Sequence, residues 1–515
     1  MASGACLLIF VALIVLSSQQ QFDFATPKPR PHRQTLIAPN YMGFSIEWND
    51  MASIFTPGAQ KPVTQLFANL QTLSKQPVLI RIGGISEDNV WLDGVPGRNA
   101  TVFPFSINMT VMNNIAQLAT QVPIQYLAGL PTVHSMNNVN ATVAFMQAMV
   151  DSKMIAHMTG VELGNEPHNF GIPVGTYVSN YWMPMLQAIY NNIPASKPLQ
   201  FAGLSSYNPQ DEMATWTQTV STAPFVTTNH IKTLATVHTY GTYGNVSLQT
   251  LLGLPSPTEF DYIASASATY TDDIILGETN SIIGVGGGIQ GVSNVFGSAL
   301  WSLDFYAYAA WNGLGSARLH GVMGAADFTN IETAFKYSPF LINQASNVAD
   351  KPVNVRPIYY SMIAFTNALS WVSSNQDIVP IIPSAKTNTS LIKIYGFQSQ
   401  NNTTMSVIII NKTNQTIPVS FMLPAADQNQ TSAVVEWLRA PNVTSTLGIT
   451  YAAQTFDGTK DGLPIGARKI ETIQSVGGVY NISMPQYSAS VILVGGTQVK
   501  ATNASKVVCK PRVRR

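Results

Sequence analysis

Residues 158–170 read MTGVELGNEPHNF, and an apolar run in this stretch ends in Asn-Glu-Pro at positions 165–167. The short run GVEL before the tripeptide predicts a β-strand. Pro167 has no N–H to donate to a neighbouring strand, so the strand should end before it. Glu166 is then left at the carboxyl end of a strand, either as an active-site acid or as an incidental glutamate in a strand-end turn.

A second apolar run, IILGETN at residues 274–280, also ends abruptly in a carboxylate, Glu278. Glycoside hydrolysis uses a pair of carboxyl groups, one as general acid and the other as nucleophile or general base. Two strand-end glutamates in matched contexts therefore indicate a glycosidase, with Glu166 and Glu278 as the candidate catalytic residues.

Short apolar stretches alternate with longer helical patterns over residues 40–374. Eight units of this kind predict an α/β fold, the (β/α)8 TIM barrel of about 250 residues, whose functional residues gather at the carboxyl ends of the strands. Glu166 would end the fourth strand and Glu278 the seventh, so that both face one sugar across the barrel mouth. The expected strands are Tyr41–Glu47, Val78–Gly83, Ile124–Leu130, Gly160–Asn165, Leu199–Leu204, Leu234–Thr239, Ile274–Glu278 and Ala317–Met323. The expected helices include Val63–Ser74, Asn138–Val150, Val174–Asn192, Val292–Ala310 and Ile358–Val372.

The pattern changes after Ser374 to short alternating strands separated by turn residues. This change predicts a C-terminal antiparallel β-sandwich domain over residues 375–499. A polar, proline-rich lead-in occupies residues 19–39. Residues 500–515 form a basic tail that we expect to be disordered.

The charges of the chain nearly cancel: 27 Lys and Arg stand against 26 Asp and Glu, a net charge of +1 over 515 residues. No global field therefore favours nucleic acid as a partner. The apolar run at residues 5–16 is too short to span a bilayer but suits a signal peptide over residues 1–18. With no later stretch suited to a membrane anchor, we expect a protein that is secreted or delivered to an acidic vacuolar or lysosomal compartment.

Cysteine and asparagine usage also bear on the expected compartment of the protein. Cys6 and Cys509 are the two cysteines, and Cys6 would leave with the signal peptide, so no intramolecular disulfide is expected. Frequent Asn-X-Ser/Thr sequons indicate N-linked glycans on exposed loops and strand edges. The sequons are at Asn99, Asn108, Asn140, Asn245, Asn388, Asn401, Asn402, Asn411, Asn414, Asn429, Asn442, Asn481 and Asn503.

Polar residues at other strand ends are further candidates. Glu47 ends the first strand at the barrel mouth, unless it is a buried or salt-bridged glutamate. Arg81 lies inside the second strand and suits a buried partner of a catalytic carboxylate better than a substrate ligand. The sixth strand ends in VHTYG, which supplies His238 and Tyr240. The phenol of Tyr240 either donates a hydrogen bond to Glu278, keeping it ionised, or belongs to the core.

Glycines at 284, 286, 287 and 288 follow Glu278 and precede a helical pattern. Their backbone N–H groups, near a helix N-terminus, suit an anion such as a sugar carboxylate, although a flexible loop is the alternative. The sequence contains no HExxH motif, no clustered Cys and His, and no nucleotide-binding glycine motif. We therefore expect no metal and no cofactor.

The stretches GVELGNEPHNF, ILGETNSIIGVGGG and WSLDFYAYAAWNGLGSARLHG resemble glycoside hydrolase family 79, the heparanase and β-glucuronidase family of the clan A retaining glycosidases. The resemblance implies that Glu166 is the acid/base and Glu278 the nucleophile. It also implies that the lead-in supplies a strand of the β-domain. The implied substrate-binding residues are Asn165 at the sugar 2-hydroxyl, Glu47 at other ring hydroxyls, Tyr240 on the nucleophile, and Gly286, Gly287 and Gly288 at the glucuronate carboxylate. Apart from the resemblance, Arg81, His238 and His320 are candidates for a supporting role.

The sequence departs from heparanase over residues 91–123, which are short and nearly uncharged where heparanase has an excised linker and basic clusters. This favours a single-chain, exo-acting enzyme. We expect a secreted retaining β-glucuronidase that releases β-linked glucuronic acid from glycans or glycoconjugates by double displacement. The alternatives are another clan A glycosidase that acts on neutral sugars and a non-catalytic glycan-binding wall protein.

Overall fold

The computed structural model describes most of the chain between Gln20 and Gly495. The described residues are 20–27, 37–56, 58–134, 138–207, 209–254, 273–283, 287–321, 335–342, 353–372, 378–383, 391–399, 404–424 and 429–495. The expected signal peptide, the expected basic tail and Gly286 lie outside these residues.

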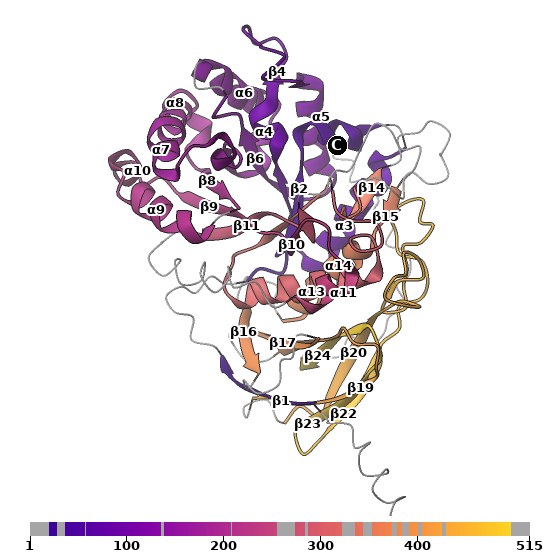
Figure 1. Cartoon of the computed structure of the whole chain (residues 1–515). Helices are drawn as coiled ribbons and strands as arrows, with labels where there is room; N and C mark the ends of the chain where they lie inside the picture. The colour runs from indigo at the N-terminus through magenta and orange to yellow at the C-terminus, as the bar shows by residue number, and fades with distance from the viewer. Residues whose placement is uncertain are drawn as a thin grey trace, which may run out of the picture.

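Eight parallel strands close into a barrel in the upper part of Figure 1, in the order β11-β13-β2-β3-β6-β7-β8-β9. Each of the eight stretches expected to form a strand contributes one strand to this barrel, so the predicted (β/α)8 fold is confirmed. The strands are β2 (Met42–Ile46), β3 (Val78–Ile82), β6 (Ile124–Leu130), β7 (Met158–Leu163), β8 (Gln200–Ser206), β9 (Thr233–His238), β11 (Asp273–Thr279) and β13 (Ala317–His320).

The barrel strands are buried on both faces, and the two faces differ in chemistry. On β2, Phe44 points outward, where its ring lies 5.1 Å from the ring of Phe67 on α3 (Gln60–Ser74). The next residue, Ser45, points inward and accepts a hydrogen bond from Arg81 of β3 at 3.1 Å. Since side chains alternate along a strand, this register places polar groups inside the barrel and apolar groups against the helices.

Helices cover the outside of the barrel. They include α3, α5 (Met109–Gln121), α6 (Val139–Asp151), α7 (Val174–Tyr177), α8 (Met183–Asn192), α9 (Pro209–Ser221), α10 (Pro224–Thr228), α11 (Leu248–Gly253), α13 (Phe296–Trp311) and α14 (Pro357–Val372). Shorter elements lie in the loops: α2 (Trp48–Met51), α4 (Ile85–Asn89), β4 (Val90–Leu92), β5 (Phe105–Ile107), η4 (Pro167–Phe170), β10 (Thr242–Tyr243), β12 (Ile282–Ile283), β14 (Phe340–Ile342) and β15 (Val353–Val355).

Two expected helices differ from the structure. The single helix expected over Val174–Asn192 is α7 and α8 joined by a π-helical turn at Val178–Trp182. Pro184 in the first turn of α8 has no N–H for the regular ladder, which accounts for the wider turn just before it. Helix α13 begins at Phe296 rather than at Val292, because Gly291 has φ +76 and donates its N–H to the side chain of Asn294 in a turn.

Ten strands form the second sheet, in the lower part of Figure 1. The lead-in supplies β1 (Gln20–Pro27), which pairs in parallel with β19 and antiparallel with β16. Since β20 pairs with both β22 and β24, the sheet closes over an apolar core that contains Phe22, Val407 and Phe421. The other strands are β16 (Ile378–Pro383), β17 (Ile392–Ser399), β18 (Thr404–Asn411), β19 (Ile417–Met422), β20 (Ser432–Arg439), β21 (Thr450–Tyr451), β22 (Glu471–Val476), β23 (Val479–Met484) and β24 (Ser488–Gly495).

Helices α13 and α14 lie between the barrel and the second sheet (Figure 1). Asp304 of α13 pairs with Lys412, which follows β18, at 2.5 Å and also accepts a hydrogen bond from Tyr395 of β17. Asn367 of α14 donates to Glu436 of β20 at 2.9 Å. These buried polar contacts fix the second sheet against the barrel.

One sequon is closed to modification in the folded chain. Asn411 is fully buried, and its side-chain nitrogen donates to the carbonyls of Gln415 and Pro485, both at 2.8 Å. Among the described residues, no helix has the length and apolar character needed to cross a membrane.

Candidate active site

Glu166 lies just beyond the end of β7, in a strained conformation. The strand ends at Leu163, Gly164 follows with φ +87, and Glu166 has φ +47 in the left-handed region. The N–H of Glu166 donates to the carbonyl of Ser205 at 3.0 Å, which fixes this turn against the adjacent strand β8. Left-handed backbone is uncommon for a non-glycine residue and is concentrated at functional sites.

Glu278 lies near the end of β11 and faces Glu166 across the barrel mouth. One oxygen of Glu166, one oxygen of Glu278 and one ring nitrogen of His238 all lie within 4.8 Å of one another. Both glutamates are buried, with 7% of Glu166 and 6% of Glu278 exposed. Retaining glycosidases hold their two carboxyl groups about 5–5.5 Å apart, so the spacing suits nucleophilic attack rather than the wider inverting arrangement.

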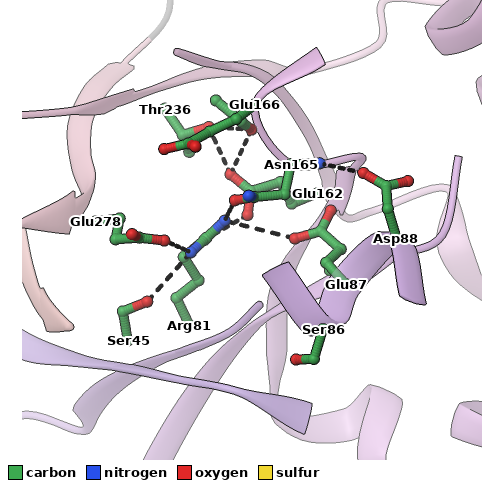
Figure 2. A network of polar contacts seen from close by, with 12 residues as sticks. Ser45, Arg81, Ser86, Glu87, Asp88, Glu162, Asn165, Glu166, Thr236 and Glu278 are labelled. Atoms are coloured by element: carbon green, nitrogen blue, oxygen red, sulfur yellow. Dashed lines mark hydrogen bonds and ion pairs between the residues drawn. The ribbon is translucent and has the colours of Figure 1, made fainter. Parts of the chain in front are cut away.

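Arg81 is the centre of the network beneath this pair. Figure 2 shows its guanidinium between Glu278 on one side and Glu162 and Glu87 on the other. It donates to Glu162 at 2.5 Å, to Glu278 at 3.0 Å and to Glu87 at 3.5 Å, and it is fully buried. A guanidinium presents its donors in a rigid fork, so one Arg81 side chain fixes three carboxyl groups relative to one another.

Glu162, Glu87 and Asp88 belong to this network and are absent from the sequence prediction. Glu162 of β7 accepts hydrogen bonds from Ser205 at 2.9 Å and from Thr236 at 2.5 Å. A signal for it exists in the sequence: a charge inside the apolar strand GVEL must be paired when the strand is buried. Glu87 and Asp88 lie on α4 in a loop, where the sequence alone gives no such signal.

The pKa shifts divide these carboxyl groups into two kinds. Burial raises the pKa of Glu278, but nearby His320, His238 and Arg81, with the hydrogen bond from Tyr240, outweigh burial and hold it well below the ordinary value. Burial and the neighbouring Glu162 raise the pKa of Glu87 well above its ordinary value. Glu278 is therefore the ionised nucleophile candidate, and Glu87 is a neutral acid behind it.

Asn165 is held from two sides. Its side-chain oxygen accepts from Arg81 at 2.8 Å, and its backbone N–H donates to Asp88 at 2.8 Å. With the oxygen engaged by Arg81, the amide NH2 is the part of Asn165 left to donate toward a ligand in the mouth.

Glu47 lies at the N-terminus of α4 rather than free in the mouth. It accepts the backbone N–H of Ile85 at 3.1 Å and that of Ser86 at 2.8 Å, and the Ser86 hydroxyl also donates to it. Burial raises the pKa of Glu47 above its ordinary value, although His320 and the bonds from Ser86 oppose the rise.

The aromatic and histidine candidates contact the two candidate catalytic glutamates. Tyr240 donates to Glu278 at 2.7 Å, and His238 Nδ1 lies 2.7 Å from Glu166. His320 links the network to Glu47: its Nε2 lies 3.7 Å from Glu47, and its Nδ1 lies 3.8 Å from Glu278. All these predicted residues therefore meet at one barrel mouth.

The described part of the glycine-rich loop is tightly packed. Gly287 and Gly288 have φ +88 and +92, and a Cβ on either would lie 2.7 Å from an atom of Phe335 or Ser293. Gly287 accepts the backbone N–H of Tyr337 at 3.1 Å, and the Tyr337 ring lies 6.3 Å from the rings of Tyr240 and His320. Tyr337 is a further residue at the site that the sequence prediction missed, since no pattern marks it.

Glu166, His238 and Glu278 are also close enough to share a metal ion, the one such grouping in the described ranges. Each already has a partner: Glu278 accepts from Arg81 and Tyr240, and Glu166 contacts His238 and accepts from Asn169 at 2.7 Å. These contacts hold the two carboxylates in fixed orientations at the mouth.

No family model matches the chain. In sequence it is similar to a beta-glucuronidase of Neurospora crassa, 26% identical over 240 residues, which cover 45% of this chain and 39% of the relative. A beta-glucuronidase of Aspergillus niger is 24% identical over 231 residues, 42% of this chain and 40% of the relative. The chain thus spans about two fifths of the length of the curated relatives it matches.

Solved structures extend the likeness in fold to nearly the whole chain. A 4-O-alpha-L-rhamnosyl-beta-D-glucuronidase of Fusarium oxysporum 12S superposes with a TM-score of 0.67 at 19% identity, covering 92% of this chain and 99% of that one. A GH51 arabinofuranosidase of Xanthomonas axonopodis pv. citri gives a TM-score of 0.60 at 13% identity, covering 92% and 99%. The chain therefore has the fold of the clan A glycoside hydrolases and, over less than half of its length, sequence similarity to β-glucuronidases.

Proposed function

We propose that the protein is a retaining β-glucuronidase that removes terminal β-linked glucuronic acid. The observation that carries the proposal is the pair of buried carboxyl groups, Glu166 and Glu278, with oxygens within 4.8 Å of each other at the barrel mouth. The similarity to two proteins named beta-glucuronidase supports glucuronate as the sugar. Exo-action and secretion are parts of the same proposal.

In the first step Glu278 attacks the anomeric carbon, and Glu166 protonates the oxygen of the departing group. Arg81 and Tyr240 keep Glu278 ionised and orient its carboxylate. Glu162 accepts a hydrogen bond from Arg81 and so fixes the guanidinium. In the second step Glu166, now a carboxylate, takes a proton from water, and that water releases glucuronate from Glu278. The NH2 of Asn165 is placed to donate to the sugar 2-hydroxyl.

The loop after β11 and the segment after β13 supply the binding site for the glucuronate carboxylate. Gly287 and Gly288 keep backbone close to the mouth because no side chain fits at either position. Tyr337 lies against this loop, and the preceding residue, Lys336, brings a positive charge to the same segment. Backbone N–H groups with a nearby cation favour a carboxylate over a neutral hydroxymethyl group.

Trapping the covalent intermediate tests the proposal. Incubation with 2-deoxy-2-fluoro-β-D-glucuronosyl fluoride should inactivate the enzyme, and peptide mass spectrometry should place one added fluoroglucuronosyl group on Glu278. Glu278→Gln should abolish both labelling and turnover of an aryl β-glucuronide. Labelling at another residue, or activity retained in Glu278→Gln, contradicts the proposal.

A panel of aryl glycosides separates the sugar alternatives. Hydrolysis of the β-glucuronide in excess of the β-glucoside and the α-arabinofuranoside is expected, and the reverse order assigns the chain to a glycosidase of neutral sugars. Binding of glycans without any hydrolysis supports a non-catalytic wall protein instead. Because the mechanism uses only side chains, EDTA should leave turnover unchanged.

A further inference from the structure

Exposed aromatic side chains gather beside the general acid candidate. Phe170, at the end of η4 just after Glu166, is 42% exposed, and Tyr207, just after β8, is 52% exposed. Both follow barrel strands at the end that carries the mouth. Large exposed rings beside a polar site favour ligand contact over a structural role.

Neighbouring rings brace both side chains. Phe170 lies 4.9 Å from His134, which lies 6.2 Å from Phe103, which in turn lies 4.7 Å from the buried Trp91. These four rings come from the loops after β3, β6 and β7. Tyr207 meets His168 edge to face with ring centroids 3.9 Å apart. We call Phe170, Tyr207, His134 and His168 the aromatic rim.

Asp88 ties the rim to the catalytic residues. Its carboxylate accepts the backbone N–H groups of Thr132 at 2.9 Å, Val133 at 3.0 Å and Asn165 at 2.8 Å. His134 Nδ1 lies 3.0 Å from the carbonyl of the same aspartate. One buried carboxylate therefore joins the loops after β3, β6 and β7 beside Glu166, and it fixes His134, on which Phe170 packs, relative to the acid.

The direction of the leaving group follows from the roles proposed above, and this inference rests on them. The glucuronate carboxylate lies toward Gly287 and Tyr337, on the loops after β11 and β13. The general acid must contact the oxygen of the departing group. The leaving group then extends away from the glycine-rich loop and across the loops after β7 and β8, where Phe170 and Tyr207 lie.

The charges of the rim indicate what kind of leaving group fits. The described parts of the segments that connect the barrel strands at the mouth to the next helix carry three Lys or Arg residues: Arg98 after β3, and Lys336 and Arg356 after β13. Arg98 donates to the carbonyls of Phe103 and Pro104, both at 3.0 Å. Lys336 lies on the glucuronate side. Burial lowers the pKa of His168, which keeps this ring neutral beside Tyr207.

We propose that the aromatic rim is an aglycone subsite in which Phe170 and Tyr207 stack on an uncharged ring of the leaving group. A ring with a flat apolar face, either an aromatic ring or the C–H face of an unsulfated pyranose, has the required shape. The described residues of the loops after β7 and β8 include no Lys or Arg that could pair with the sulfate of a sulfated sugar. Phe170 and Tyr207 are thus specificity-determining residues of the leaving-group side.

The test compares leaving groups. For each protein, kcat/KM is measured with β-glucuronosyl fluoride, which has no ring to stack, with 4-methylumbelliferyl β-glucuronide, and with two disaccharides, β-glucuronosyl-N-acetylglucosamine and its 6-O-sulfated form. Phe170→Ala and Tyr207→Ala should each lower kcat/KM roughly tenfold for the umbelliferyl and unsulfated substrates and leave the fluoride unchanged. Tyr243→Ala is the matched control: Tyr243 is 76% exposed at the same end of the barrel, on the loop after β9, and should change none of these values.

The outcomes separate this inference from the proposed function. The expected pattern, with the sulfated disaccharide cleaved more slowly than the unsulfated one, supports the rim as an aglycone subsite. Equal losses on fluoride and ring substrates, or faster cleavage of the sulfated disaccharide, overturn the inference while the glucuronidase assignment stands. Failure of the wild-type protein to cleave any of the four glucuronides overturns the proposed function itself.

Discussion

Tyr240 adds one hydrogen bond to the contacts that lower the pKa of Glu278, after those of His320, His238 and Arg81. Tyr240 donates to it at 2.7 Å inside a buried site, where a bond to a charged group is stronger than in water. The phenol stays protonated, since burial raises the pKa of Tyr240 well above its ordinary value. Tyr240 therefore donates over the whole pH range in which such an enzyme works.

Tyr240→Phe should move the acid limb of the pH profile upward. Losing a donor to the ionised form raises the pKa of Glu278, so the nucleophile becomes protonated at higher pH. We expect kcat/KM to fall about tenfold and its acid limb to rise by about one pH unit, the equivalent of a bond of about 1.5 kcal/mol to a charged group. Tyr243→Phe, which removes a phenol from the neighbouring β10, should leave the limb in place. An unshifted limb in Tyr240→Phe would show that the bond does not tune Glu278.

Asp50 supplies a pH dependence of stability rather than of activity. Burial, and then the charge of Glu47, raise the pKa of Asp50 to about 7 in the folded chain. The folded state thus favours the protonated form, and stability is lost as pH rises from about 4 to about 7 while the unfolded chain ionises.

Asp50→Asn removes this titration. The stability of the variant relative to wild type should increase by about 3 kcal/mol between pH 4 and pH 7.5, measured by denaturant unfolding at several pH values. Asp93→Asn, at an exposed position, is the control. A difference that stays constant with pH would mean that Asp50 is ionised in the folded protein.

At the scale of elements, the connection from β3 to α5 carries a matched pair of glycines. Gly84 has φ +97, and a Cβ there would lie 2.4 Å from a carboxylate oxygen of Glu47; Gly94 has φ +90 and nothing within 4 Å. Both glycines avoid backbone strain, but only Gly84 also leaves room for Glu47.

Comparing Gly84→Ala with Gly94→Ala should therefore separate the effect of backbone strain on stability from the effect of a displaced Glu47 on activity. Both should lose about 1 kcal/mol of stability from the left-handed backbone. Only Gly84→Ala should lower kcat/KM, by about tenfold or more, since it displaces Glu47 from the mouth. Thermal unfolding and initial rates measure the two effects, and equal activity in both variants would count against a substrate-binding role for Glu47.

Elements were easier to predict than contacts between them. The eight barrel strands follow from apolar runs such as IQYLAGL, because a strand buried on both faces needs an apolar side chain on nearly every residue. The carboxyl ends of these strands then bring Glu166 and Glu278 to one mouth. The sequence does not show that Arg81 bridges three carboxyl groups, because the partners Glu87 and Glu162 come from different loops and strands whose register only the closed barrel sets.

At the scale of the whole molecule, one buried ion pair holds the second sheet to the barrel. Asp304 and Lys412 lie 2.5 Å apart, with 8% and 1% of their side chains exposed. Removing one member of a buried pair leaves the other charge unpaired in the interior, which costs more than the pair contributes.

Asp304→Asn should lower the free energy of unfolding by about 3 kcal/mol. The double variant with Lys412→Met should recover part of that loss, because the unpaired charge is gone. Glu471→Gln, which removes a charge from an exposed strand position, should change stability by less than about 0.5 kcal/mol. Denaturant unfolding compares these proteins with Lys412→Met alone, and losses of the two single variants that add up in the double variant would argue against a coupled pair.

The position of β1 has a consequence for biosynthesis. Gln20 pairs with Val419, so strand β1 waits for a partner that is made almost 400 residues later. At roughly 5–20 residues per second, the ribosome needs about 20–80 s to deliver that partner. During this interval the barrel can assemble on the nascent chain while β1 remains an unpaired edge, open to chaperones and to other chains. Premature termination before β16 would release a barrel whose strand β1 lacks both of its partner strands, β16 and β19.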